Sequence, residues 1–172
     1  MSPRRSSFRI MSMPSDKKTS TSIYRLTERH IPEVAKIEAQ TFSEPWSERA
    51  LSILCTDGYP SFVLCEETGE VAGYVSTARA LDEIQIINVA VRADRKRRGY
   101  GKALLDALDL YCEGNSIEQI SLEVRESNSA AIALYEKCGY INAGLRKNFY
   151  RLPTESAIVM IKNFNRTGKT QC

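Results

Sequence analysis

Hydrophobic and polar positions along the chain follow two periods, one typical of strands and one typical of helices. Seven short apolar runs predict strands at residues 23–26, 61–65, 71–80, 84–91, 120–124, 140–148 and 156–161. Apolar residues three and four apart predict helices at residues 31–42, 47–54, 100–112 and 129–137. This order predicts an α/β domain with a mixed central sheet of about six to seven strands and helices on both faces.

Residues with special backbone preferences mark the ends of several elements. Pro32 lies near the first turn of the helix at 31–42, and Thr27 precedes it as a candidate cap. Gly139 follows the helix at 129–137, where a glycine commonly ends a helix. The nearly continuous apolar run at 84–91 predicts a strand buried on both faces, which starts a right-handed parallel strand–helix–strand unit.

Both ends of the chain lack this periodicity. Residues 1–20 are rich in Ser, Lys and Arg and predict a disordered, mildly basic leader, and Met11 or Met13 are alternative starts. Residues 165–172 predict a flexible tail. The remaining residues, 21–164, are predicted to form one domain and are numerous enough to bury a sizeable core.

Composition narrows the class of protein. The chain has 172 residues, of which 42% are hydrophobic and 26% are charged, as in ordinary globular domains. A formal net charge of +3 is too small to imply nucleic-acid binding by itself. No apolar run approaches the ~20 residues that span a membrane. We therefore expect no direct binding to membrane or nucleic acid, and the cysteine usage described next favours a reducing cytoplasm as the location.

Cysteine and histidine usage excludes several chemistries. The five cysteines are odd in number and include no C-x-x-C pair, so neither a metal site nor a disulfide framework is expected. His30 is the only histidine, and its place before a helix favours a capping or surface role. A Ser–His–Asp or Cys–His hydrolase would therefore depend on His30 alone. A general base is more readily Glu, Asp, Lys, Tyr or Cys.

The most informative segment is the basic turn that follows the run at 84–91. Gly99 and Gly101 lie in this turn directly before a helix, and a helix N-terminus offers unpaired N–H groups to a phosphate. The cations around it are Arg95, Lys96, Arg97, Arg98 and Lys102. The glycines are too close for a Walker A loop, and Leu104 stands where a dinucleotide fingerprint needs its third glycine. A pyrophosphate-containing cofactor is one interpretation, and a solvated basic turn is the other.

Together with further motifs, this segment resembles a known protein family. K-R-R-G-Y-G at 96–101, L-E-V-R at 122–125 and A-L-Y-E-K-C-G-Y at 133–140 resemble the Gcn5-related N-acetyltransferases, over about residues 24–162. F-S-E-P-W-S at 42–47, L-E-V-R-E-S-N at 122–128 and R-K-N-F-Y at 146–150 most resemble the bacterial members that acetylate the N-terminal alanine of ribosomal proteins. The first motif has two residues more than the usual F-P-W-S, and Lys96 replaces the usual Gln or Arg.

The resemblance implies acetyl-CoA as the cofactor. It places the pantetheine arm along one strand and the pyrophosphate on the amides of the basic turn. The residues so implied are Val89, Ala90, Val91, Arg97, Arg98, Gly99, Tyr100, Gly101, Lys102 and Asn128. An Asn before a helix is also sufficiently explained as an N-cap, and the two roles are compatible.

The resemblance also implies two catalytic residues. Glu123 is the candidate base, because alternation places it off the apolar face of the strand at 120–124; a solvated carboxylate or a partner of the Arg125 region is the plain alternative. Tyr135 is the candidate acid, and a core aromatic is its alternative. The implied parting of the strands at 84–91 and 120–124 would free an amide, Val89 or a neighbour, to polarise the acetyl carbonyl.

The implied acceptor is the α-amine of a small first residue, of the Ala or Ser type, on a ribosomal protein. Phe42, Trp46 and Tyr150 would line its pocket, although apolar core caps would look the same in sequence. An α-amine has a pKa near ~7.7–8 against ~10.4 for lysine, so a modest base can serve it. The alternatives are an acetyltransferase for a small amine or lysine, and a non-catalytic CoA-binding regulatory module. We expect a monomer or weak dimer.

Overall fold

The computed structural model describes residues 9–13 and 20–164. The strands of this part are β1 (Arg9–Met13), β2 (Thr21–Arg25), β3 (Phe62–Glu66), β4 (Val71–Ala80), β5 (Glu83–Val91), β6 (Gln119–Arg125), β7 (Ile141–Arg151) and β8 (Thr154–Asn163). Its α-helices are α1 (Ile31–Thr41), α2 (Glu48–Leu51), α3 (Tyr100–Gly114) and α4 (Ser129–Lys137). Short 3₁₀ turns lie at η1 (Glu28–His30), η2 (Ser52–Cys55) and η3 (Ala93–Arg95).

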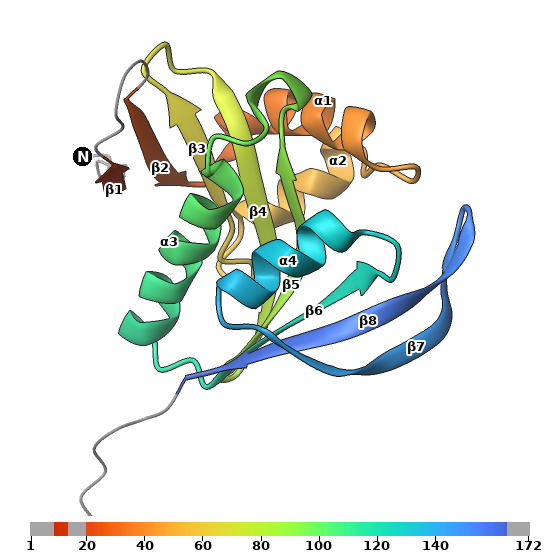
Figure 1. The fold of residues 1–172 in the computed structure, drawn as a ribbon. Helices are drawn as coiled ribbons and strands as arrows, with labels where there is room; N and C mark the ends of the chain where they lie inside the picture. The colour runs from red at the N-terminus through yellow and green to blue at the C-terminus, as the bar shows by residue number, and fades with distance from the viewer. Residues whose placement is uncertain (1–8, 14–19, 165–172) are drawn as a thin grey trace, which may run out of the picture.

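All eight described strands form one sheet in the order β1-β2-β3-β4-β5-β6-β8-β7. Its ladders are antiparallel except for β5 and β6, which are parallel. Helices α3 and α4 cover one face and α1 and α2 the other (Figure 1). The predicted mixed sheet with helices on both faces is confirmed.

The prediction of a disordered leader is wrong at residues 9–13. These residues form β1, which pairs antiparallel with β2 and adds a strand to the number expected. Without β1, β2 would leave a row of unpaired N–H and C=O groups at the sheet edge, and such an edge readily accepts another strand. The rest of the predicted leader and the predicted tail, 1–8, 14–19 and 165–172, lie outside the described residues.

Most other predicted elements are confirmed within a few residues. The predicted helix at 47–54 is divided into α2 and η2. The last two strands are longer than predicted and meet at a tight turn around Leu152 and Pro153. His30 is only 6% exposed, and its Nδ1 accepts the Thr27 backbone N–H at 3.1 Å, so it is a capping residue and not a surface residue. Burial and then Arg29 lower the pKa of His30 to about 4.

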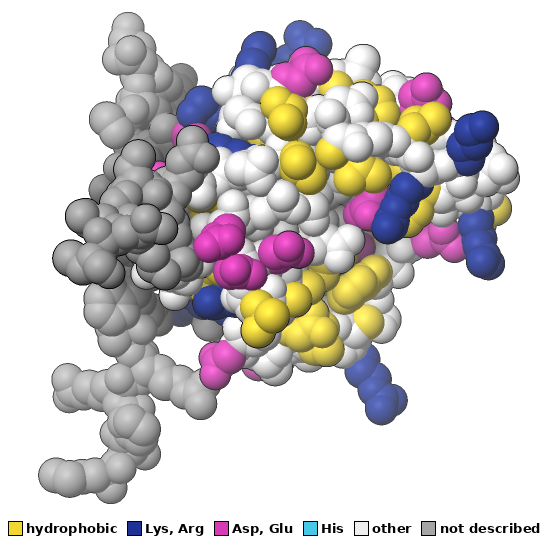
Figure 2. All heavy atoms as spheres, turned by 90° about the horizontal axis from the view of Figure 1, so that it is seen from below, with side chains coloured by type: hydrophobic (Ala, Val, Ile, Leu, Met, Phe, Trp, Pro, Cys, Tyr) yellow, Lys and Arg dark blue, Asp and Glu magenta, His cyan; other side chains and the backbone are white. Residues whose placement is uncertain are grey.

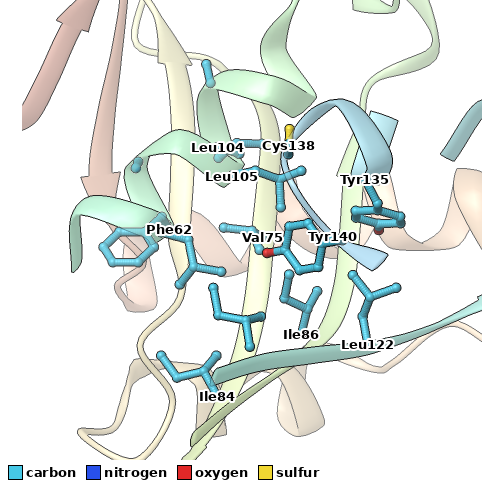
Figure 3. Close-up of a cluster of buried hydrophobic side chains, with 14 of the residues drawn as sticks. Phe62, Val75, Ile84, Ile86, Leu104, Leu105, Leu122, Tyr135, Cys138 and Tyr140 are labelled. Carbon is cyan, nitrogen blue, oxygen red and sulfur yellow. The ribbon is translucent and has the colours of Figure 1, made fainter. Parts of the chain in front are cut away.

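The sheet separates two hydrophobic cores. Alternation along β3 sends Phe62 and Leu64 toward α3, and Val63 and Cys65 toward α1 and α2. The α3 core contains Leu104, Leu105 and Leu108 and extends to Tyr135 and Tyr140, which lie beside Leu122 and Ile86 (Figure 3). The second core is built on Val34, Ile37, Leu51 and Leu54. Both cores hold the central strands in place.

The hairpin of β7 and β8 extends from the body of the sheet (Figure 1). Four large apolar side chains on β7 or its turn are exposed, namely Ile141, Leu145, Phe149 and Leu152. Viewed from below, hydrophobic patches alternate with acidic and basic groups (Figure 2). In the described part of the chain, no helix has both the length and the apolar character needed to cross a membrane.

A buried ion pair ties the end of β3 to the turn that precedes α3. Glu66 is 5% exposed, and its Oε1 accepts the Nε–H of Arg95 at 2.6 Å and the hydroxyl of Tyr100 at 3.2 Å. The hydrogen bond from Arg95 is the main reason that the pKa of Glu66 is lowered. The chain between β5 and α3 is therefore anchored to the sheet at the end of η3 and at the start of α3.

Replacing Gly73 by alanine should destabilise the fold. A Cβ at Gly73 would lie 2.9 Å from the backbone oxygen of Ala90 and 3.3 Å from Leu104 Cδ1, so β5 or α3 must shift. We expect Gly73→Ala to lose about 1–3 kcal/mol in urea unfolding, as overpacked cores do. Gly58→Ala is the control, because a Cβ there meets nothing within 4 Å. Equal stability of the two variants would contradict this packing.

Replacing Glu66 by glutamine should cost stability only where the carboxylate is ionised. We expect a loss of about 1.5–3 kcal/mol near neutral pH, as for a hydrogen bond to a charged group. Because folding lowers the pKa of Glu66, its stabilisation is present above the unfolded value of ~4.3 and disappears as pH falls through the folded value. Urea midpoints measured from about pH 7 down to about pH 3 should therefore converge for the two proteins.

Glu67→Gln is the control for this titration, because Glu67 is the exposed neighbour of Glu66. We expect it to change stability by no more than about 0.5 kcal/mol at any pH. A loss in Glu66→Gln that stays constant down to acid pH would contradict the ion pair.

Candidate functional site

The site is built where β5 and β6 separate. The two strands pair only from Glu83, Ile84 and Gln85 to Gln119, Ile120 and Ser121, whereas β6 continues to pair with β8 as far as Arg125. Beyond Gln85, the backbone groups of β5 that face β6 therefore have no strand partner. The predicted parting of these strands is confirmed.

A bulge bends β5 at the point of separation. Ser76 pairs with Asn88 and Thr77 with Ile86, so Ile87 is an extra residue opposite β4. The prediction that 84–91 is buried on both faces is wrong for this reason. Ile87 to Val89 are half-buried, because β6 no longer pairs beside them. Gln85 is exposed although it still pairs with Ser121 of β6.

A cavity of about 590 Å³ occupies this opening. Its walls come from the loop after α1, from β5, β6 and β7, and from α4. Among the residues predicted for the site, the cavity brings together Phe42, Trp46, Val89, Glu123, Asn128, Tyr135 and Tyr150. Segments more than 100 residues apart in the sequence thus meet around one volume, which favours a binding site over separate core caps.

Glu123 projects from β6 into this cavity and is held by two side chains. Its Oε1 accepts Arg146 Nη1 at 2.9 Å and its Oε2 accepts Gln85 Nε2 at 3.0 Å. Its side chain is 13% exposed. The alternative of a freely solvated carboxylate is therefore wrong, and its ionic partner is Arg146 and not the Arg125 region.

Tyr135 lies on the inner face of α4 at the border between core and cavity. Its ring packs edge-on against Tyr140, with centroids 5.6 Å apart, and the residue is 7% exposed. Burial raises the pKa of Tyr135 well above the usual range, so its hydroxyl keeps its proton near neutral pH. No described residue makes a hydrogen bond to this hydroxyl, which leaves a proton donor facing the cavity.

The start of α4 is set by Asn128. Its Oδ1 accepts the backbone N–H of Ala131 at 3.2 Å, so the capping role predicted for this residue is confirmed. Asn128 also lines the cavity, where its remaining hydrogen-bonding capacity is available.

Hydrogen bonds around Tyr150 tie the end of β6 to the hairpin of β7 and β8. Arg125 stacks 4.2 Å from the centre of the Tyr150 ring and donates to Glu155, Pro153 and Leu152 at the hairpin turn. The Tyr150 hydroxyl donates to the backbone oxygen of Glu123 at 3.2 Å. Across the opening, the Ser43 hydroxyl donates to the Leu152 oxygen at 2.9 Å.

The basic turn before α3 has the backbone of an anion-binding loop. Gly99 caps the helix at φ +77° and Arg97 has φ +62°, a conformation that L residues rarely adopt. The first intrahelical bond runs from Ala103 N–H to Gly99 O, so the amides of residues 100–102 point outward from the helix end. Successive N–H groups in such a turn form a concave site for a phosphate.

Two of the predicted cations have other tasks. Arg95 pairs with Glu66, and Lys102 pairs with Asp106 at 2.6 Å one turn along α3. Lys96, Arg97 and Arg98 are exposed and make no ion pair with a described residue. At Gly101, packing also favours glycine, because a Cβ there would lie 3.0 Å from Leu134 Cδ2 of α4.

Sequence reasoning missed Gln85, Arg146 and Glu38. The first two hold Glu123, and their proximity depends on strand registers between distant segments. Glu38 is fully buried beside the cavity and accepts bonds from Trp46 and Asn88, which line it. A signal was present for Glu38, because it lies four residues after Val34 on the apolar stripe of α1.

Comparisons with known proteins agree with this arrangement. A model of the "Acetyltransferase (GNAT) family" matches residues 31–140. The [ribosomal protein bS18]-alanine N-acetyltransferase of Escherichia coli strain K12 is 38% identical over 143 residues, which are 81% of this chain and 95% of that protein. A putative [ribosomal protein bS18]-alanine N-acetyltransferase of Bacillus subtilis strain 168 is 31% identical over 149 residues, 86% of this chain and 99% of that protein.

Solved structures show the same relationship. The crystal structure of the ribosomal-protein-S18-alanine N-acetyltransferase from Escherichia coli matches with a TM-score of 0.82 and 34% identity, over 88% of this chain and 99% of that one. The motif resemblance is thereby confirmed. Since the family match spans more than half of the chain and curated relatives exceed 30% identity along most of their length, this chain belongs to the GNAT family of acetyl-CoA-dependent N-acetyltransferases.

Proposed function

We propose that this protein acetylates the α-amine of a small first residue, Ala or Ser, on a ribosomal protein. The observation that carries the proposal is the convergence of Glu123, Tyr135 and the aromatic residues Phe42, Trp46 and Tyr150 on one cavity. The names of the two curated relatives, which specify alanine of ribosomal protein bS18, support the choice of acceptor.

The chain's residues fit acetyl-CoA, which supplies an acetyl group activated as a thioester when it is bound. The residues proposed to hold its pyrophosphate are Arg97, Arg98, Gly99, Tyr100, Gly101 and Lys102, through the outward amides of the turn and the start of α3. The exposed cations of this turn add attraction for phosphate. The main chain of Val89, Ala90 and Val91 is proposed to bind the pantetheine arm, and Asn128 to add a polar contact.

The proton transfers are assigned to two groups with suitable positions. Glu123 accepts the proton of the acceptor amine, directly or through one water molecule, and Gln85 and Arg146 fix the orientation of its carboxylate. Tyr135 keeps its proton because it is buried, and it supplies that proton to the leaving sulfur. A free amide of β5 near Val89 donates to the acetyl oxygen.

Replacing Tyr135 by phenylalanine should remove the acid and keep the packing. We expect kcat to fall about 10²- to 10⁴-fold, the range for a lost general acid. The melting temperature should change little, because no described residue bonds to the lost hydroxyl. Tyr140→Phe is the matched control, since the Tyr140 hydroxyl is also buried without a partner among the described residues but does not line the cavity. Equal turnover in both variants would make Tyr135 a packing residue only.

The acceptor is tested by acetyl-CoA-dependent thiol release with three groups of amines. The first group contains peptides that begin with free Ala or Ser and lack lysine, the second contains blocked peptides with one internal lysine, and the third contains small amines. We expect turnover only with the first group, because the aromatic walls leave room for a chain terminus. Turnover confined to lysine peptides or small amines would contradict the proposal. CoA binding with no turnover in any group would favour a regulatory module.

A further inference from the structure

Glu38 is a carboxylate in a place that normally excludes charge. It lies in the last full turn of α1 on the apolar side, and it is 0% exposed. A buried carboxylate is costly unless hydrogen bonds satisfy it. An acidic residue near a helix C-terminus is also unfavourably placed relative to the helix dipole. Its contacts should therefore explain why it is there.

All contacts of the Glu38 carboxylate come from neutral donors. Its Oε1 accepts the backbone N–H of Trp46 at 3.2 Å and Asn88 Nδ2 at 3.0 Å. Its Oε2 accepts the hydroxyl of Tyr74 and, at 3.3 Å, the same Asn88 amide. No cation in the described part of the chain pairs with it, and burial raises its pKa. The carboxylate thus joins α1 to β4, β5 and the loop after α1.

Two of these three partners form walls of the cavity. Trp46 belongs to the loop after α1, Asn88 belongs to β5, and both line the cavity, whereas Tyr74 and Glu38 do not. The loop after α1 also makes an exposed hydrogen bond to the hairpin turn of β7 and β8, from the Ser43 hydroxyl to the Leu152 oxygen. Glu38 is therefore the buried anchor that fixes Trp46 relative to β5.

We propose that Glu38 is a positioning residue that sets the width of the acceptor end of the cavity. It acts through Trp46 and Asn88 and does not contact the acceptor. This inference rests on the proposed function only in taking the loop side of the cavity as the acceptor side. Loss of the carboxylate should loosen Trp46 and weaken acceptor binding, while the distant basic turn keeps its affinity for acetyl-CoA.

Glu33 provides a matched control on the same helix. Its Oε2 accepts the backbone N–H of Val71 at 2.8 Å, so it also ties α1 to β4. It does not line the acceptor cavity and lies beside a separate surface pocket. If the substitutions act only by weakening the packing of α1 on the sheet, then replacing Glu38 and replacing Glu33 should have similar effects on kinetics and fluorescence.

The test compares Glu38→Met, Glu38→Gln and Glu33→Met in the full chain. Methionine fills a similar volume without accepting a hydrogen bond, so the donors of Trp46, Tyr74 and Asn88 lose their acceptor. Steady-state kinetics use whichever acceptor the wild-type protein acetylates. If the proposed acceptor class is wrong, the role of Glu38 can therefore still be tested with the acceptor that is used. We expect Glu38→Met to raise the acceptor KM about tenfold, as for loss of a charged hydrogen bond, with an unchanged KM for acetyl-CoA. Glu38→Gln, which keeps one accepting oxygen, should recover most of the acceptor binding.

Trp46 is the only tryptophan in the chain, so its fluorescence reports on the loop directly. We expect acrylamide to quench Trp46 fluorescence more strongly in Glu38→Met than in wild type or Glu33→Met. This measurement does not require the variants to be active. Should Glu38→Met fail to fold, Tyr74→Phe removes one donor outside the cavity and should raise both the quenching and the acceptor KM to a smaller extent. Unchanged quenching and acceptor KM in the folded variants, or equal effects at Glu33, would overturn the proposal.

Discussion

The separation of β5 from β6 after Gln85 is the constraint on which the rest of the site depends. In a continuous parallel ladder, the two strands would satisfy each other's backbone groups and leave no space between them. Here the bulge at Ile87 bends β5 away, and β6 continues along β8. Backbone donors that lose a strand partner must find another, and in this opening a ligand can take that place.

Acidic residues hold the elements that surround the opening. Glu66 fixes the turn before α3, Glu38 fixes the loop after α1, and Glu155 fixes the hairpin through Arg125 and the Ser127 amide. The partners of Glu66 and Glu155 come from distant segments of the sequence, and Glu38 joins the nearby Trp46 to the distant Asn88. The walls are thus positioned by specific hydrogen bonds, and hydrophobic packing alone would not define their spacing. Precise spacing is what positioning a nucleophile and a proton donor requires.

Much of the fold could be predicted from periodicity, because both cores depend on alternation within single elements. The strand Val71–Ala80 and the helix Ser129–Lys137 were predicted with the observed bounds. Edge strand β1 was not, because its stability comes from pairing with β2 and not from its own composition. The burial of β5 was overestimated, because its apolar sequence does not reveal that β6 separates from it after Gln85.

The candidate site was predicted less evenly. Family motifs indicated Glu123, Tyr135 and Asn128, and the cavity that they share agrees with those indications. The motifs could not reveal the donors to Glu123, since Gln85 and Arg146 reach it only through the strand registers. Counting charges also overestimated the number of unpaired cations in the turn before α3, because Arg95 and Lys102 form ion pairs with Glu66 and Asp106. Long-range pairing is the information that a local pattern lacks.

Amide hydrogen exchange along β5, measured with and without CoA, tests most directly whether the opened strand is a ligand-binding surface. We predict that the amides of residues 86–91 that do not bond to β4 exchange rapidly in the free protein and become protected when CoA binds. The amides of residues 97–102 should gain protection with them, while the paired start of β6 should not change. Amides of β5 that are fully protected without CoA, or that CoA leaves unprotected, would contradict this account.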